Sequence, residues 1–385
     1  MPEPFAPQAR PDGGEPTELP GFVRAGSIWR SDLRLAPLGP VEPPLPWPAA
    51  LRWSGGGADD TVVALDIETT GLAGAASMVF LVGVAWRDGN EVCVRQWLAP
   101  DLPFEPDLLD ALATELPASG VRLVTFNGDA FDLPFLRTRA RFCGVPLRLA
   151  PGLDVLPHAR RLYRDRDGSC RLTHLEATRL GRQRLDDLPG ALVPQVYYDA
   201  LQREERALLE PIARHNAWDL VATLGLLWQV AHDLEAPLAP GADPHDLFGR
   251  FRHARSRADD EAAAAALEAC LAADPPAWVR RRAVAELARL HRRRGAVGER
   301  HALWERMASD PDAPPVFLVE WAKVLEHEVR DLPGAHAAAG AALARLRGLA
   351  RLTGHADAQA EAAILHRLER LERRMRGRAR PSRAG

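Results

Sequence analysis

The sequence predicts an α/β fold, a mixed sheet flanked by helices, followed by an all-α region. Three observations lead to this prediction. Short runs rich in Val, Leu and Trp alternate with helical runs from Thr61 to about residue 236. The first three strand-like runs follow one another before any helix, which is typical of an antiparallel portion of a mixed sheet. Beyond Pro240 the composition shifts to Ala, Arg, Leu and Glu without a strand pattern.

The elements of the α/β region follow from the period of the apolar residues. The expected order is strands over 61–68, 78–86 and 91–99, a helix over 106–116, a strand over 121–127 and a helix over 131–142. Two further helical runs fall within 152–185. Residues 204–234 are predicted to form one long helix, which Pro237 and Pro240 terminate.

The chain of 385 residues is long enough for two domains with cores of their own. Residues 1–60 form a Pro-rich segment, with twelve of the 33 prolines before residue 51, and we expect it to be partly extended or disordered. A short element around 21–35 is expected to pack on the first domain. That domain spans 61–236, and a helical domain spans 244–374.

A weak internal repeat supports the helical domain. Residues 286–302 align with 320–336, an offset of 34 that equals the period of a tetratricopeptide repeat. We therefore expect about three stacked helix pairs. Residues 375–385 form a basic tail, which either acts as a cationic arm or is simply a solvated helix end.

Composition narrows the function classes. The net charge is −3, so any contact with nucleic acid must come from local positive patches rather than from a global field. The four cysteines form no Cys-x-x-Cys pair, which argues against a zinc ribbon or a disulfide framework. No secretory leader and no apolar stretch of about 18 residues is evident, so we expect a cytoplasmic protein without a membrane partner.

Two carboxylates end the first strand of the α/β region. Asp66 and Glu68 are two residues apart in VVALDIETTGL, so their side chains project from the same face near the carboxyl end of the strand. Like charges this close repel unless a cation lies between them, and oxygen ligands suit Mg²⁺ or Mn²⁺. A chance Asp-x-Glu in a surface turn is the alternative.

Two more segments offer acids where strands end and helices start. In VTFNGDAFDLPFL, Asn127 ends a strand and Asp132 opens a helix, although an acid in a first helical turn can be only a dipole partner. In RHNAWDLVATLGLLW, His215 and Asp219 are four residues apart and share a helical face beside an apolar stripe. A satisfied core pair is the alternative for these two.

DIETTGL, NGDAFD and HNAWD, in this order, resemble the three motifs of the DnaQ-like 3′–5′ exonucleases of the ribonuclease-H-like superfamily, whose four acids read Asp, Glu, Asp, Asp. Residues 172–201 are similar to the YprB-like branch, in which such a domain precedes tetratricopeptide-like repeats. The resemblance implies a five-stranded mixed sheet and single-stranded DNA or RNA 3′ ends as substrate. It also leaves the repeats free to bind a protein partner.

The resemblance implies a two-metal mechanism with Mg²⁺ or Mn²⁺. Asp66 would bridge both ions, Glu68 and Asp219 would complete the water-activating site, and Asp132 would hold the second ion through water. His215 would accept the proton of the attacking water. In the histidine-type relatives His precedes the last Asp by five residues, whereas here the spacing is four, so the role of His215 as a base stays open.

Further residues are implied to contact the substrate. Thr69, Thr70, Gly71 and Leu72 would line the 3′-terminal nucleotide, with Leu72 against the terminal base, and Asn127 would orient the site. Ordinary packing is the alternative for Leu72 and Asn127. At the level of the whole protein, the alternatives are an inactive scaffold that acts through its repeats, and an endonuclease or RNA-trimming enzyme on the same fold.

Overall fold

The computed structural model describes residues 15, 17–39, 51, 60–71, 77–150, 152–238, 241–310 and 313–379. The chain divides into two compact units. The first unit comprises residues 1–239 together with 249–259, and the second comprises 240–248 and 260–385. Within the described residues, no helix is both long and apolar enough to cross a membrane.

The first unit is built on a mixed sheet with the strand order β1-β2-β5-β4-β3-β6-β7. The strands are β1 Val23–Ala25, β2 Ile28–Leu35, β3 Thr61–Thr69, β4 Val79–Asp88, β5 Glu91–Leu98, β6 Val121–Thr125 and β7 Gly152–Asp154. β3 pairs antiparallel with β4 and parallel with β6, and β6 pairs parallel with β7. The expected mixed sheet is therefore present, with seven strands among the described residues instead of five.

The two additional strands come from the segment that the sequence predicts to be partly extended or disordered. β1 and β2 form a hairpin, and β2 pairs antiparallel with β5 from Trp29 to Leu35. Ile28, Trp29 and Leu35 of β2 are buried, because each packs into a hydrophobic core of the first unit. The element expected around 21–35 takes this form.

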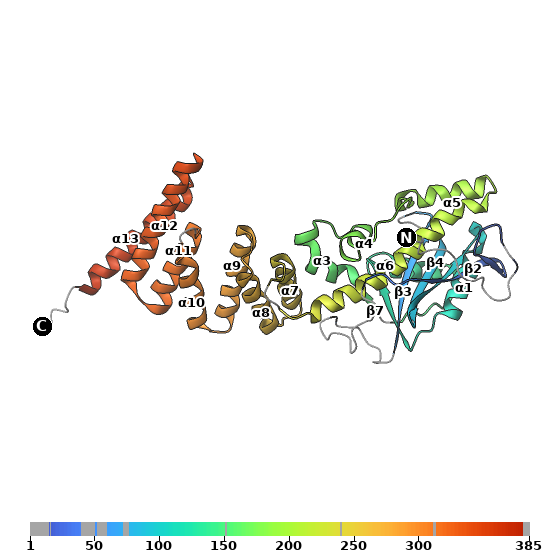
Figure 1. Ribbon diagram of the computed structural model, residues 1–385, viewed down its shortest axis with the longest axis horizontal. Coiled ribbons are helices and arrows are strands. Elements are labelled where there is room, and N and C mark those ends of the chain that lie inside the picture. Colours follow the sequence, from blue (N-terminus) through green and yellow to red (C-terminus); the bar gives the residue numbers. More distant parts are fainter. Residues whose placement is uncertain are drawn as a thin grey trace. The chain divides into compact units, whose positions relative to one another are not determined.

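Helices cover both faces of the sheet (Figure 1). Those of the first unit are η2 Leu102–Phe104, α1 Glu105–Glu115, α2 Asp132–Cys143, α3 Val155–Asp167, α4 Leu172–Arg179, η3 Gly190–Leu192, α5 Val193–Gln202, η4 Arg206–Leu209 and α6 Glu210–Glu235. The core on one face contains side chains of α3 and α6, and the core on the other contains side chains of α1 and α2. The sequence predicts one helix over 204–234, whereas its first turn is the 3-10 helix η4.

A glycine in β4 lets α6 lie close to the sheet. Gly83 pairs with Asp66 on one side and with Gln96 on the other. A Cβ atom added at Gly83 would lie 2.1 Å from Asn216 Oδ1 and 2.6 Å from Leu220 Cδ1. Any side chain at this position would therefore push α6 away from the strand that carries Asp66.

The second unit is helical throughout its described residues. Its elements are the first part of α7 Pro244–Ser256, then α8 Asp260–Ala272, α9 Ala277–Arg293, α10 Val297–Ala308, α11 Pro315–Val324, the π-helical turn η5 Leu325–Val329, α12 Leu332–Thr353 and α13 Ala358–Ala379. From α8 onward, each helix packs against the next one in sequence. This arrangement agrees with an all-α region, while its classification as tetratricopeptide-like stays a prediction.

Two predicted boundaries differ from the structure. Residues 249–259, at the end of α7 and just after it, group with the first unit, because they pack on α3. The predicted tail over 375–385 is not a separate segment at its start, since α13 continues to Ala379. Residues 380–385 lie outside the described part of the chain.

Candidate active site

Asp66 and Glu68 lie on the face of β3 that is covered by α6. They alternate in phase with Ala64, which belongs to the core formed with α6. The register of β3 against β4 shifts between Glu68 and Thr69, a bulge that bends the strand just after the second acid. Both acids keep part of their surface exposed, so they line a site rather than a core.

Asp132 reaches the same strand from the start of α2. β6 pairs with β3 only as far as Ala64, so the N–H of Ile67 has no neighbouring strand on that side. The carboxylate of Asp132 takes this place and accepts the Ile67 N–H at 3.2 Å. Asp132 is 5% exposed, so its carboxyl group is held against β3 at the backbone N–H of the residue that separates Asp66 from Glu68. It is more than a partner of the helix dipole.

The turn before α2 is organised by an acid that sequence reasoning did not single out. Asp154, buried at the end of β7, accepts the backbone N–H groups of Asn127 at 2.8 Å and of Leu156 at 2.9 Å. Asn127 adopts a left-handed conformation with φ of 73°. A Cβ at Gly128 would lie 2.3 Å from Thr125 Cβ. Asn127 is exposed and shapes this turn through its backbone.

The third motif is held against β3 by a buried amide relay. Asn216 of α6 donates to Asp66 Oδ2 at 2.7 Å, and Gln96 of β5 donates to Asn216 Oδ1 at 2.8 Å. Gln96 also donates to the carbonyl of Ala213 at 2.7 Å. Asn216 is fully buried and Gln96 is 1% exposed. The relay therefore fixes the register of α6 on the sheet and the rotamer of Asp66 together.

His215 and Asp219 lie one turn apart on α6, with His215 Nε2 3.6 Å from Asp219 Oδ2. On its other side, His215 Nδ1 lies 2.7 Å from Asp187 Oδ1, in the segment between α4 and η3. A carboxylate at Nδ1 fixes the orientation of the imidazole and leaves Nε2 facing the site. The chain therefore pairs its candidate base with an orienting acid.

Arg184 brings a positive charge into this acidic cluster. Its Nη2 lies 2.7 Å from Asp219 Oδ1, and its Nη1 donates to Asp187 at 3.0 Å. From behind, its Nε donates to Glu176 at 2.6 Å. Glu176 is fully buried on α4, and the Arg184 side chain is 4% exposed. Arg184 is consequently fixed in place and neutralises Asp219.

The four acids of the motifs interact electrostatically. Burial, reinforced by Asp219, Asp132 and Glu68, raises the pKa of Asp66 well above its usual range. Burial also raises the pKa of Glu68 to about 8, with Asp219 and Asp132 adding to the effect, and it raises the pKa of Asp132 to about 7. Each carboxylate makes ionisation of the others less favourable. A bound cation would remove this repulsion and lower their pKa values.

His215 responds in the opposite direction to the same charges. Burial alone lowers its pKa, but the hydrogen bond to Asp187 and the charges of Asp219 and Glu68 outweigh burial and raise the pKa to about 9. A pKa of about 9 leaves the imidazole protonated at neutral pH, with Asp187 as its hydrogen-bond partner. The shift depends on carboxylates whose charge a metal ion would offset.

The residues expected at the terminal nucleotide are only partly described. Thr69 and Thr70 are buried, and their hydroxyl groups serve the turn itself: Thr69 Oγ1 donates to the carbonyl of Gly71 at 2.8 Å, and Thr70 Oγ1 accepts the N–H of Met78 at 2.9 Å. A Cβ at Gly71 would lie 2.7 Å from Ser77 Oγ. Leu72 lies outside the described residues.

The structure thus assembles the predicted acids and His215, but not as a preformed metal cage. Within the described ranges, no three His, Cys, Asp or Glu side chains converge tightly enough to hold a metal ion. Asp66 is hydrogen-bonded to Asn216, Asp132 to the β3 backbone, and Asp219 contacts Arg184. Each of these three carboxylates therefore contacts a donor group of the protein rather than a shared ion. Sequence reasoning missed Asp187, Arg184 and Asn216, although Asn216 lies inside the third motif.

Comparison with known proteins bears on the fold of this unit. Residues 63–230 match the model of a family described as the RNase_H superfamily. The first unit has a ribonuclease-H-like fold. This agrees with the predicted fold class, and the matched range contains all four acids and His215.

A curated relative and two solved structures are also similar to the chain. Over 272 residues the chain is 27% identical to the Bacillus subtilis (strain 168) protein described as uncharacterized protein YprB, an alignment that covers 69% of this chain and 65% of the relative. The aligned part thus spans slightly less than two thirds of that protein. A structure described as the apo form of the nuclease is 18% identical, covers 49% of this chain and 91% of its own, and has a TM-score of 0.24. Brucella melitensis NrnC bound to pGG is 17% identical, with coverage of 50% and 93% and a TM-score of 0.24.

Proposed function

We propose that the first unit is a metal-dependent 3′–5′ exonuclease that hydrolyses phosphodiester bonds at single-stranded nucleic-acid ends. The observation that carries this proposal is the gathering of four interacting carboxylates, from three separate segments, on the α6 side of β3 in a ribonuclease-H-like fold. The 3′–5′ polarity is proposed on the resemblance of DIETTGL, NGDAFD and HNAWD to the DnaQ-like motifs.

The donor set fits divalent cations. Asp66, Glu68, Asp132 and Asp219 offer carboxylate oxygens, the ligands that Mg²⁺ and Mn²⁺ prefer, and their mutual repulsion favours neutralisation by cations. Two such ions would supply water activation and compensation of charge on the phosphate. Asp219 would exchange its contact with Arg184 for an ion, and Asp187 would keep the imidazole of His215 directed toward the site.

Single-stranded DNA and RNA labelled at the 3′ or the 5′ end test the proposal. With Mn²⁺, we expect stepwise shortening from the 3′ end and no reaction in chelator. Asp66→Asn and Asp219→Asn should each lower the rate by about a thousandfold, since electrostatic stabilisation by metal ions is worth several kcal/mol.

Asp129→Asn is the matched control. Asp129 is an exposed acid in the turn before α2, and the same neutralisation there should leave the rate within a factor of two. Equal rates for Asp66→Asn, Asp219→Asn and the wild type would refute the assignment. Release of nucleotides from the 5′ end would leave the assignment of the site intact but would show that the proposed 3′–5′ polarity is wrong.

The close contact of Arg184 with Asp219 favours one alternative, an inactive scaffold whose acidic cluster is neutralised from within. Its helical unit would then bind a protein partner. Calorimetric titration with Mn²⁺ separates the two functions, because a scaffold of this kind takes up no ion. An exonuclease should bind Mn²⁺ in the wild type and bind it much more weakly in Asp219→Asn.

A further inference from the structure

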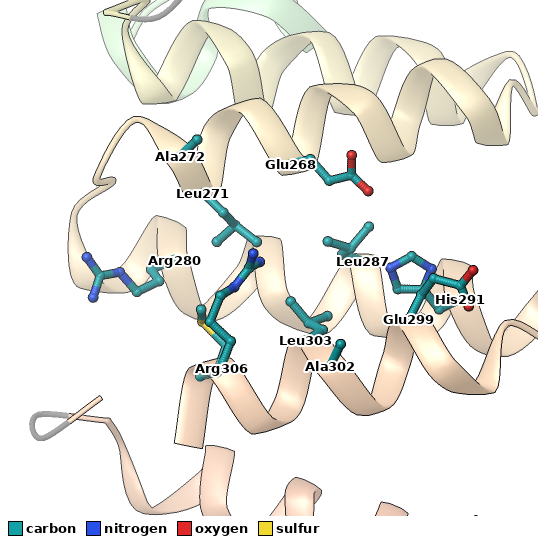
Figure 2. A pocket seen from close by; sticks show the side chains of 11 residues that line it. Glu268, Leu271, Ala272, Arg280, Leu287, His291, Glu299, Ala302, Leu303 and Arg306 are labelled. Carbon is teal, nitrogen blue, oxygen red and sulfur yellow. The ribbon is translucent and has the colours of Figure 1, made fainter. Parts of the chain in front are cut away.

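Two grooves of the helical unit differ in charge. One lies between α8, α9 and α10, has a volume of about 660 Å³, and is lined by charged side chains of both signs, with Glu268 and Glu299 opposite Arg280 and Arg306 (Figure 2). The other is lined by α9, α10, α11 and η5 and has a volume of about 530 Å³. It carries five cationic side chains against two acids, namely Arg281, Arg289, Arg292, Arg300 and Lys323 against Glu320 and Glu328.

We propose that this second groove binds the phosphate backbone of single-stranded nucleic acid. Its wall is α9, which contains six arginines and one glutamate. Arg281, Ala285, Ala288 and Arg292 follow one another at steps of four, three and four residues, so they lie along one face of the helix. The two arginines are eleven residues apart, which is about 16 Å along a helix, and small side chains separate them.

The cations at the two ends of this row are available to a ligand. Arg281 and Arg292 are both exposed, and within the described part of the chain neither has an ion-pair partner. The other cations are already engaged: Arg289 with Glu286 at 2.8 Å, Lys323 with Glu320 at 2.5 Å, and Arg300 with Glu328. The unpaired charge of the groove therefore lies on Arg281 and Arg292.

The shape of the groove suits a flexible polyanion. Ala285 and Ala288 line the groove with small side chains between the two arginines, and the buried Trp304 and Phe317 line it from α10 and α11. Guanidinium groups bind phosphate oxygens in bidentate fashion, and a row of them along a helix matches a repeating anionic chain. The choice of nucleic acid over an acidic peptide rests on the proposed nuclease function of the first unit.

Binding without hydrolysis tests the inference. Fluorescence anisotropy of a labelled 20-nucleotide strand is measured with the full-length protein in chelator, over a range of salt concentrations. Arg281→Gln together with Arg292→Gln should weaken binding about fivefold or more at moderate salt. The slope of log affinity against log salt should fall by about 1.4, since each single-strand phosphate contact contributes about 0.7.

The matched control is Arg351→Gln together with Arg373→Gln, which removes the same charge from exposed arginines of α12 and α13 outside the groove. We expect its affinity to stay within a factor of two of the wild type. Unchanged affinity and slope in the groove variant would overturn the inference. So would tight binding of a labelled oligoglutamate peptide when the 20-nucleotide strand binds weakly.

A second readout separates this inference from the proposed function. The rate of trinucleotide hydrolysis with Mn²⁺ should be the same in the wild type and in the groove variant. A trinucleotide has only two phosphodiester bonds, and it would bind at the acidic site of the first unit without needing the groove. If the trinucleotide is not cleaved by any variant while the groove variant still loses affinity for the strand, the exonuclease assignment fails and the groove assignment stands.

Discussion

Asn216 is the residue on which the position of Asp66 depends most directly. Its Nδ2 donates to Asp66 Oδ2 at 2.7 Å, its Oδ1 accepts from Gln96 at 2.8 Å, and both Asn216 and Gln96 are buried. Asn216→Ala leaves Gln96 with the carbonyl of Ala213 as an acceptor but removes the side-chain one, and it frees the carboxylate of Asp66. We expect a loss of about 1–3 kcal/mol in the free energy of unfolding, the usual cost of unsatisfied buried polar groups.

The same change should lower the rate of strand shortening by more than the stability loss explains, because Asp66 no longer has a fixed rotamer. Urea unfolding and labelled-strand hydrolysis measure the two effects. Gln229→Ala is the control, since among the described residues the Gln229 side chain bonds only to Asp233 on the same helix, 2.8 Å away, on a half-buried surface. A full rate in Asn216→Ala would show that the relay does not position Asp66.

The site residues that sequence could predict share short segments. Asp66 and Glu68 are marked by their two-residue spacing, and His215 and Asp219 by their helical spacing. Asp187 and Arg184 carry no such mark. Asp187 and His215 are separated by 28 residues in the sequence, and Asn216 and Asp66 by 150. These contacts therefore form only when α6 packs on the sheet. Such partners follow from tertiary packing rather than local pattern.

At the level of elements, α3 and α7 meet through a pair of histidines. His158 Nδ1 lies 2.9 Å from His253 Nε2, and His253 is 1% exposed. Burial lowers the pKa of His158 to about 4 and that of His253 to about 3, and the positive charges of Arg161 and Arg257 add to both shifts. Both rings are therefore neutral in the folded chain at neutral pH.

This pair predicts a loss of stability in mild acid. The folded pKa values lie below the ordinary value near 6.5, so the unfolded chain binds protons first as the pH falls. The stabilisation is complete above about pH 6.5 and declines as the pH falls toward 4. His253→Gln removes one of these groups while keeping a polar partner for His158, so the wild type should lose about 2 kcal/mol more than this variant between pH 7 and pH 5.

Urea unfolding at the two pH values measures the difference, and His355→Gln serves as control because His355 is exposed on the loop before α13. If the stability of His253→Gln falls with pH as much as that of the wild type, His253 takes up no proton on unfolding and the explanation fails.

The elements themselves were predicted to different degrees. β3 to β6 and α1 to α4 follow from apolar period and turn residues, because their local preference agrees with their packing. The hairpin of β1 and β2 is predicted only as a short element, since its surroundings are Pro-rich and the residues of β5 that pair with β2 lie between Val92 and Leu98, far along the chain. The hairpin is buried only because β2 pairs with β5 in the folded sheet.

On the scale of the whole molecule, sequence composition predicts two regions but not their boundary. The change to Ala, Arg, Leu and Glu begins near Pro240, whereas residues 249–259 belong to the first unit through contacts with α3. α7 lies beyond Pro240, yet its residues from 249 onward belong to the first unit, so composition alone does not show which core a helix joins. The buried contacts of a helix determine the unit to which it belongs.

The second unit contains a buried ion cluster that offers a test of its independence. Glu326 in η5 is fully buried at its side chain and accepts from Arg367 at 2.6 Å, Arg370 at 2.7 Å and Arg374 at 2.6 Å. Glu326→Gln removes the negative charge that these three arginines share and leaves their charges facing one another. We expect a loss of about 3 kcal/mol, the range measured when one partner of a buried pair is removed.

If the two units unfold separately, this loss should affect only one of them. Calorimetry of the full-length variant should show one transition moved to lower temperature and another unmoved, and trinucleotide hydrolysis with Mn²⁺ should keep its rate. Glu361→Gln is the control, because Glu361 pairs with Arg347 on an exposed surface, where such pairs contribute at most about 1 kcal/mol. A shift of both transitions, or a loss of hydrolysis, would mean that the helical unit supports the fold of the acidic site, and the separation of hydrolysis from strand binding would then be wrong.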